Sequence, residues 1–177
     1  MIHTRTLNTE LHVREDDRVI TGTLVPYGTP TTVVENGKRY VEDFAPGAFA
    51  GDMVRAADVE LTALHPRSGA ELPIGITVSL TDTPTGLDGE WRVSETTFGD
   101  EVLTLVRDRA LRSLSAGFAE LTNRWHTRDR VTRLTATLDH AALVRRGAYP
   151  GALLRGAGQD GLPTNTDLLL LARMRTR

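Results

Sequence analysis

The side chains of Ser115, His65 and His140 are of types that could take part in acyl-group chemistry. The chain has no cysteine, so attack on an acyl group would need a serine or threonine hydroxyl beside a general base. His65 follows the alternating segment DVELTAL and precedes Pro66, which predicts a base held at the end of a strand. The same position also suits a histidine at the edge of the core that is bonded to a backbone carbonyl.

Ser115 lies in the segment RSLSAGFAE, in which strand alternation separates an apolar face from a face of small residues. The small face carries Ser113, Ser115 and Gly117. A peptide backbone could approach this face closely because Gly117 has no side chain to obstruct it, which makes Gly117 a candidate substrate-binding residue. An ordinary solvated strand face explains the same pattern, and Ser113 offers the same chemistry two positions away.

His140 interrupts an apolar stripe in the segment RLTATLDHAALV. It shares its phase with Leu138 and Ala142, whereas the neighbouring Asp139 falls on the other face of the expected strand. A buried histidine needs a hydrogen-bond partner, and a second imidazole is a reasonable candidate.

The remaining histidines, His3, His12 and His126, lie in polar surroundings and are expected at the surface. A zinc site formed by His65, His126 and His140 is conceivable. No HxH, HxxxH or HExxH spacing supports it, so we expect neither a metal nor another cofactor.

Alternating and β-branched runs between turn signals predict the elements that would position these residues. The expected strands are 18–25, 58–64, 74–80, 113–121 and 131–144, and the expected helices are 47–57 and 99–112. The segment TDTPTGLDGE has the composition of a turn. Short strands with a few flanking helices predict an α+β fold, a small closed or partly closed β-barrel of mostly antiparallel strands.

Length and charge set limits on the function. The 177 residues suit one domain, and the net charge of -2 argues against nucleic acid as the main partner. The polar start MIHTRTLNTELHVRED lacks a signal-peptide core, and the longest aliphatic run, Leu168 to Leu171, is far shorter than the roughly 20 residues that span a membrane. We therefore expect a soluble intracellular protein with no membrane partner, in which residues 1–153 form the main domain and residues 154–177 a mobile tail or a docking helix.

Five segments occur in a fixed order along the chain. They are GTLVPYG at 22–28, EDFAPGAF at 42–49, ALHPRSGAELPIG at 63–75, LVRDRALRSLSAGF at 105–118 and LDHAALVRRGAYPGA at 138–152. Together they resemble the motifs of the prohead serine proteases of tailed bacteriophages, a family related to the herpesvirus assembly proteases. The resemblance runs over residues 18–153 and implies a herpesvirus-protease-like barrel.

The resemblance assigns roles to the candidate residues. Ser115 matches the catalytic serine of the family and His65 its catalytic histidine. His140 falls where the family commonly has glutamate, and because the herpesvirus enzymes use a second histidine there, a Ser115–His65–His140 arrangement is coherent. Asp139 is the alternative third member, although strand phase points it away.

The resemblance also implies a biological role. It predicts a serine endopeptidase that removes scaffolding segments of the major capsid protein, and then cleaves itself, inside the immature virus head in the host cytoplasm. The implied partners are the capsid protein with its scaffolding segment and a second copy of the chain, as in a homodimer. The alternative is a catalytically inactive homologue that serves as an assembly or scaffolding factor, which the histidine at position 140 favours.

Overall fold

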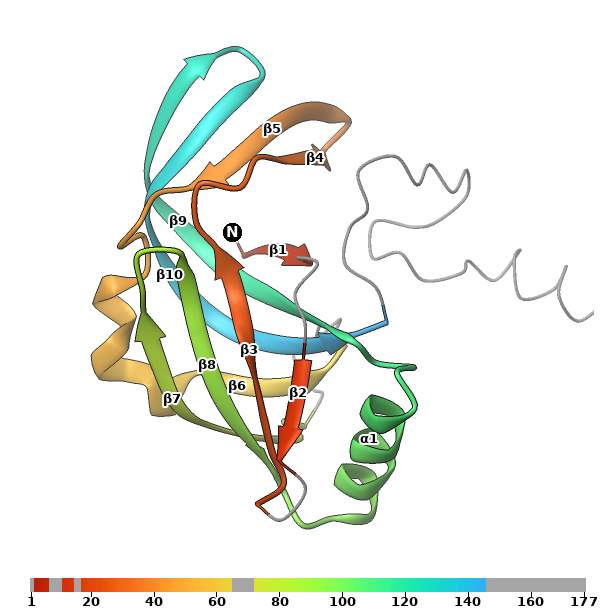
Figure 1. Cartoon of the computed structure of the whole chain (residues 1–177). Helices are drawn as coiled ribbons and strands as arrows, with labels where there is room; N and C mark the ends of the chain where they lie inside the picture. The colour runs from red at the N-terminus through yellow and green to blue at the C-terminus, as the bar shows by residue number, and fades with distance from the viewer. Residues whose placement is uncertain (1, 7–10, 15–16, 65–71, 146–177) are drawn as a thin grey trace, which may run out of the picture.

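A computed structural model describes residues 2–6, 11–14, 17–64 and 72–145 of the chain. These residues form ten strands of one sheet, one α-helix and one 3-10 helix (Figure 1). In chain order the elements are β1 (His3–Thr6), β2 (Leu11–Arg14), β3 (Val19–Pro26), β4 (Thr31–Glu35), β5 (Lys38–Phe44), the 3-10 helix η1 (Ala50–Asp58), β6 (Glu60–Ala63), β7 (Gly75–Asp82), β8 (Gly86–Val93), α1 (Thr97–Arg107), β9 (Ser113–Thr127) and β10 (Arg130–Val144).

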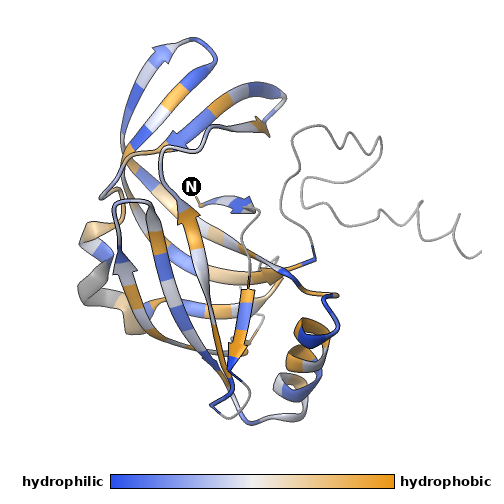
Figure 2. Ribbon diagram, in the orientation of Figure 1, coloured by the Kyte–Doolittle hydropathy of each residue, from blue (hydrophilic) through white to orange (hydrophobic). Residues whose placement is uncertain are grey.

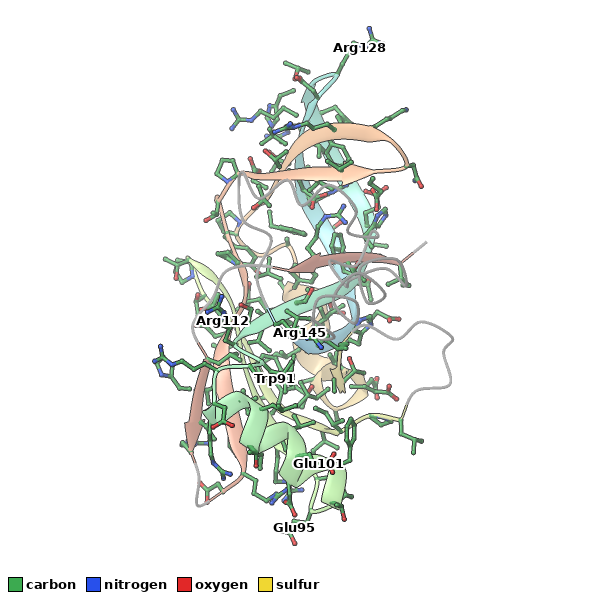
Figure 3. The ribbon with its side chains drawn as sticks, turned by 90° about the vertical axis from the view of Figure 1, so that its right-hand side faces the viewer. Trp91, Glu95, Glu101, Arg112, Arg128 and Arg145 are labelled. Carbon is green, nitrogen blue, oxygen red and sulfur yellow. The ribbon has the colours of Figure 1, made fainter. Side chains whose placement is uncertain are left out.

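The long antiparallel hairpin of β9 and β10 organises the sheet. On its other edge β10 pairs in parallel with two strands, with β5 through residues 130–133 and with β6 through residues 140–143. From β6 the sheet continues through β7, β8, β3 and β2, and it curls into a half-barrel (Figure 1). In Figure 3, Arg128 marks the tip of the hairpin, while Arg112 and Arg145 mark its open end. The predicted class, a partly closed barrel of mostly antiparallel strands, is confirmed.

The core is built from buried side chains of most of the strands and of α1. Trp91, Phe49 and Phe118 are the largest of its fully buried side chains. Figure 2 shows apolar and polar residues alternating along several strands, as expected where one face of a sheet packs on the core. Figure 3 places Trp91 in the body of the molecule. The core side of β9 contributes Leu114, Ala116 and Phe118, so the strand that carries Ser115 is held by one fully buried face.

Helix α1 begins earlier and ends earlier than the sequence predicts. The Thr96 side chain accepts a hydrogen bond of 3.0 Å from the backbone N–H of Gly99, which caps the first turn. The helix ends before Arg109, whose φ of 58° is left-handed and so terminates the helical path. Its buried side chains, Val102, Leu103 and Val106, have the spacing of one helical face. In the part of the chain that the structure describes, no helix is long and apolar enough to cross a membrane.

The expected α-helix at 47–57 is instead the 3-10 helix Ala50–Asp58. Its start is delayed because Gly47 has a φ of 80°, outside the helical region. The Phe49 and Asp52 side chains are buried, and the Asp52 carboxylate accepts a hydrogen bond of 2.8 Å from the backbone N–H of Leu138. The short helix is therefore attached to β10 close to His140.

Five strands are absent from the sequence prediction, namely β1, β2, β4, β5 and β8. The β4–β5 hairpin turns at Asn36 and Gly37, both with positive φ, and this Asn-Gly pair is a hairpin signal that the sequence analysis missed. The segment taken as a turn contains most of β8. Its Gly89 makes room for the Trp91 ring, because a Cβ there would lie 2.3 Å from a ring carbon.

Candidate active site

Ser115 lies on an internal strand, between β1 and the second half of β10. Its backbone partners are Thr6 on β1 and Ala142 on β10. The Ser115 side chain is fully buried, and Ser113, two positions away, is also buried. The alternative of a solvated strand face is therefore wrong, because the small-residue face of β9 is covered.

His140 reaches this small-residue face of β9. It pairs with Gly117, the next residue beyond Ser115 on the same side of the strand. A Cβ on Gly117 would lie 2.1 Å from His140 Cε1, so the imidazole ring sits directly over the glycine. Ser115 and His140 are thus diagonal neighbours on paired strands, a relation in which Cβ atoms are typically about 7 Å apart.

Gly117 has a structural role that the sequence analysis did not foresee. The space above its Cα is filled by the His140 ring, which an alanine side chain would strike. The absence of a side chain at Gly117 therefore leaves the space that the imidazole ring of His140 occupies. The role predicted from the sequence, contact with a substrate backbone, stays a prediction.

The strand-phase argument placed Asp139 away from the site, and the structure corrects it. The pairing of β10 with β9 shifts between Leu138 and His140, so Asp139 has no partner of its own in the register. Its carboxylate lies 2.8 Å from Nδ1 of His140. Adjacent residues on a regular strand project to opposite faces, and this irregularity is what brings the two side chains together.

His65 lies outside the described residues, but the chain that leads to it is described. Strand β6 pairs with β10 at residues 140–143, directly beside His140, and ends two residues before His65. Leu64 has a φ of 66°, rare for a residue with a side chain, and its N–H donates a hydrogen bond of 3.0 Å to the Leu143 carbonyl. The buried Thr62 hydroxyl donates a bond of 2.8 Å to the Leu64 carbonyl. Such constrained backbone is typical of functional sites.

The other histidines are separated from this site. His12 and His126 are exposed, as predicted, whereas the prediction for His3 is wrong because its side chain is buried. His126 contacts Thr132 at 2.9 Å, eight positions from His140 along β10. At about 3.3 Å per residue that is a separation of more than 20 Å, too far for the two histidines to share the zinc ion considered above.

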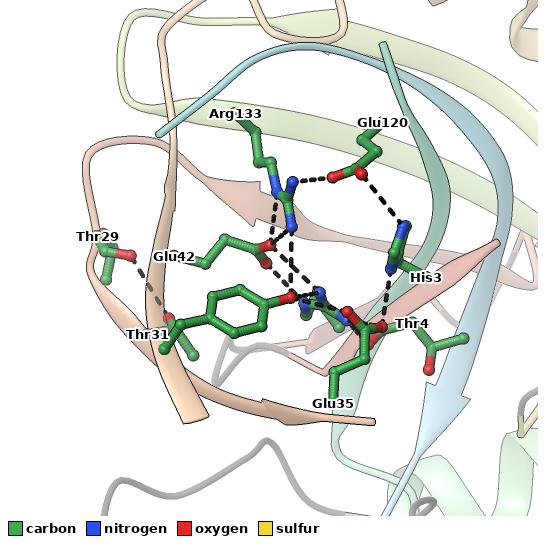
Figure 4. A network of polar contacts seen from close by, with 10 residues as sticks. His3, Thr4, Thr29, Thr31, Glu35, Glu42, Glu120 and Arg133 are labelled. Atoms are coloured by element: carbon green, nitrogen blue, oxygen red, sulfur yellow. Dashed lines mark hydrogen bonds and ion pairs between the residues drawn. The ribbon is translucent and has the colours of Figure 1, made fainter. Parts of the chain in front are cut away.

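A buried charged cluster on the core side of the sheet was also not anticipated (Figure 4). The Glu42 carboxylate accepts hydrogen bonds from Arg5, at 2.6 Å, and from Arg133, at 2.7 Å. Around this centre, Tyr40 bonds to both Arg5 and Glu35, and His3 bonds to Glu35. Burial, together with the bond to Glu35, raises the pKa of Tyr40 to about 12, so its hydroxyl stays protonated. None of these side chains lies on the Ser115 face of β9.

A half-barrel that carries a serine and a histidine on paired strands of one face defines a candidate serine hydrolase. The chain belongs to the caudovirus prohead serine protease family, whose model matches residues 6–156. It is also similar to the solved structure of the bacteriophage T4 capsid assembly protease, gp21, with a TM-score of 0.53 and 11% identity over 80% of this chain and 97% of that chain. At this identity the likeness concerns the fold alone. A comparison with the curated proteins gives no match. The family resemblance drawn from the motifs is confirmed.

Proposed function

We propose that this chain is a serine endopeptidase of virus head maturation, which removes scaffolding segments from the major capsid protein and then cleaves itself. The observation that carries the proposal is the placement of His140 beside Ser115 on one face of paired strands, within a chain of the prohead serine protease family. The chain also shares its fold with a capsid assembly protease.

The proposed mechanism is acyl transfer. The Ser115 hydroxyl oxygen attacks a peptide carbonyl while His65 takes the hydroxyl proton, and His65 then gives this proton to the departing amine. Water hydrolyses the acyl-enzyme in the second half of the reaction, with His65 again as base. His140 orients His65. Backbone N–H groups near the nucleophile are expected to stabilise the oxyanion, where loss of one donor typically costs about 10²–10³ in rate.

The proposed setting is the interior of the immature head, in the cytoplasm of the host. The proposed partners are the capsid protein with its scaffolding segment and a second copy of this chain, as target of self-cleavage and as partner in a homodimer. Residues 154–177 are proposed to hold the self-cleavage site or a segment that docks on the shell, because their Gly- and Leu-rich composition differs from that of the preceding domain.

The test is co-expression with the capsid protein of the same virus, followed by intact mass spectrometry of both proteins. We expect wild type to truncate the capsid protein and to lose part of its own tail, and Ser115→Ala to do neither. Ser113→Ala is the matched control, because Ser113 is buried on the same strand two residues away and should leave processing intact.

The alternative function, an inactive assembly factor, makes the opposite prediction. In that case wild type and Ser115→Ala would yield assembled shells with the same full-length capsid protein. Loss of processing in Ser113→Ala but not in Ser115→Ala would instead place the nucleophile at Ser113.

A further inference from the structure

We propose that Asp139 is a positioning residue that acts through His140. In this proposal the Asp139 carboxylate fixes the orientation and the tautomer of the imidazole, so that His140 Nε2 accepts a hydrogen bond from the catalytic base. The inference rests on the proposed function, since it assigns a role within the same site.

The irregularity in β10 makes the contact possible. Leu138 pairs with Phe118 and His140 pairs with Gly117, so three residues of β10 face two residues of β9. Asp139 is the additional residue, as in a β-bulge, and bulges next to active sites commonly redirect a side chain. As a result, the carboxylate and the imidazole of two consecutive residues meet at 2.8 Å instead of pointing to opposite faces.

The imidazole is confined on two sides. Its Cε1 edge lies over Gly117, where the absence of a Cβ leaves just enough room for the ring. Its Nδ1 contacts the Asp139 carboxylate. The His140 side chain is 8% exposed and that of Asp139 is 49% exposed, so the carboxylate holds a buried ring from the solvent side.

The contact determines which ring nitrogen can accept a hydrogen bond. A carboxylate accepts hydrogen bonds, so neutral His140 carries its proton on Nδ1 when it is bonded to Asp139. Nε2 is then the nitrogen without a proton and can act as an acceptor for an N–H, which is what a carboxylate does for the base in a serine-type triad. Without Asp139 the proton can move to Nε2, which would turn this acceptor into a donor.

If Asp139 positions His140, its substitution should lower activity without lowering stability, whereas a purely structural role would lower stability. A polar contact in which one partner is half exposed contributes little to stability. Asp139→Asn should therefore leave the melting temperature nearly unchanged, while it lowers kcat toward the capsid protein by about 10- to 100-fold. This is less than the roughly 10⁴-fold loss when the direct carboxylate partner of a triad base is neutralised, because Asp139 acts one residue further away. We expect KM to be unchanged. Asp129→Asn, at the opposite end of the same hairpin, is the control and should alter neither quantity.

The direct readout is the His140 tautomer, measured by ¹⁵N NMR of the imidazole in the full-length chain. We expect the Nδ1–H form in wild type and a shift toward the Nε2–H form in Asp139→Asn. Repeating Asp139→Asn in a His140→Glu variant shows whether Asp139 acts through His140 or through the stability of the chain. In His140→Glu a carboxylate can accept the hydrogen bond of the base directly, so adding Asp139→Asn there should cause no further loss of kcat.

Two results would overturn the proposal. One is an unchanged His140 tautomer in Asp139→Asn, and the other is an equal loss of kcat in the wild-type and His140→Glu backgrounds. The tautomer is measured without any substrate. A chain that cleaves nothing but shows the tautomer shift would therefore refute the proposed function while confirming that Asp139 controls His140.

Discussion

At the scale of single residues, the candidate site depends on a glycine. Gly117 lies in β9 between Ala116 and Phe118, which are fully buried, and the space over it is filled by the His140 ring. The glycine thus determines how closely β10 can bring an imidazole to the Ser115 face. Any side chain at this position has to displace the ring.

This dependence predicts the effect of Gly117→Ala. The added Cβ would lie 2.1 Å from His140 Cε1, so the ring must move. Displacement of a catalytic group by about 1 Å can cost about 100-fold in rate, so we expect kcat to fall by 10- to 100-fold. Crowding in a packed site should lower the free energy of unfolding by about 1–3 kcal/mol. Cleavage kinetics and urea unfolding measure the two effects.

Gly51→Ala is the control, because a Cβ at Gly51 meets no atom within 4 Å. It should leave both quantities unchanged. A Gly117→Ala variant with normal kcat and a raised KM would contradict the claim that Gly117 leaves room for the His140 ring. It would favour the substrate-binding role predicted from the sequence.

At the scale of elements, β10 contributes residues both to the candidate active site and to the buried charged cluster. Its second half carries His140, while its first half buries Arg133 in the charged cluster around Glu42. A register shift between Arg133 and Thr135 separates the two halves and changes which residues face inward. The cluster joins β1, through Arg5, to β5 and β10 (Figure 4).

The cluster predicts a large effect for Glu42→Gln. The carboxylate is 2% exposed and is bonded to both Arg5 and Arg133. Removing its charge leaves the buried Arg5 and Arg133 guanidinium groups with only the partly exposed carboxylates of Glu35 and Glu120 nearby. Breaking a buried pair in this way typically costs about 3–5 kcal/mol. Urea unfolding should show that loss. Glu90→Gln, in an exposed pair with Arg14, should change stability by less than about 1 kcal/mol, and equal effects of the two substitutions would contradict this account.

At the scale of the whole molecule, the cluster also affects stability in acid. Burial alone would raise the pKa of Glu35, but hydrogen bonds from His3 and Tyr40 and the charge of Arg5 outweigh it and lower the pKa to about 2. A carboxyl whose pKa is lowered on folding stabilises the fold above its unfolded pKa of about 4.5. That contribution is lost as the pH falls from about 4.5 through 2.

We therefore expect the stability difference between wild type and Glu35→Gln to narrow on acidification. The difference should be largest above pH 5 and should shrink as the pH approaches 2. The decrease should not exceed about 3 kcal/mol, because that is roughly what lowering the pKa from about 4.5 to about 2 is worth before screening by solvent. Thermal or urea unfolding at several pH values between 2 and 7 measures it. A difference that stays constant over this range would show that Glu35 is not held in its ionised form by the cluster.

The local features of the fold could be predicted from the sequence. The strands that carry Ser115 and His140, and the amphipathic helix α1, follow from the periodicity of apolar residues, which is a property of neighbouring residues. The family motifs pointed to Ser115, His65 and His140 for the same reason, because each motif is a short continuous segment. These assignments needed no knowledge of which strands pair.

The contacts that complete the candidate site could not be predicted in this way. Strict alternation placed Asp139 on the opposite face of the strand from His140, and the register shift between Leu138 and His140 overrules that pattern. Gly117 meets His140 only because residues 23 positions apart are paired, and Glu42 meets Arg133 across an even longer separation. Sequence alone therefore identified the candidate residues and the strands that carry Ser115 and His140. The tertiary structure decided which of them touch, because strand register is set by pairing between distant segments and a shift of one residue reverses the direction of a side chain.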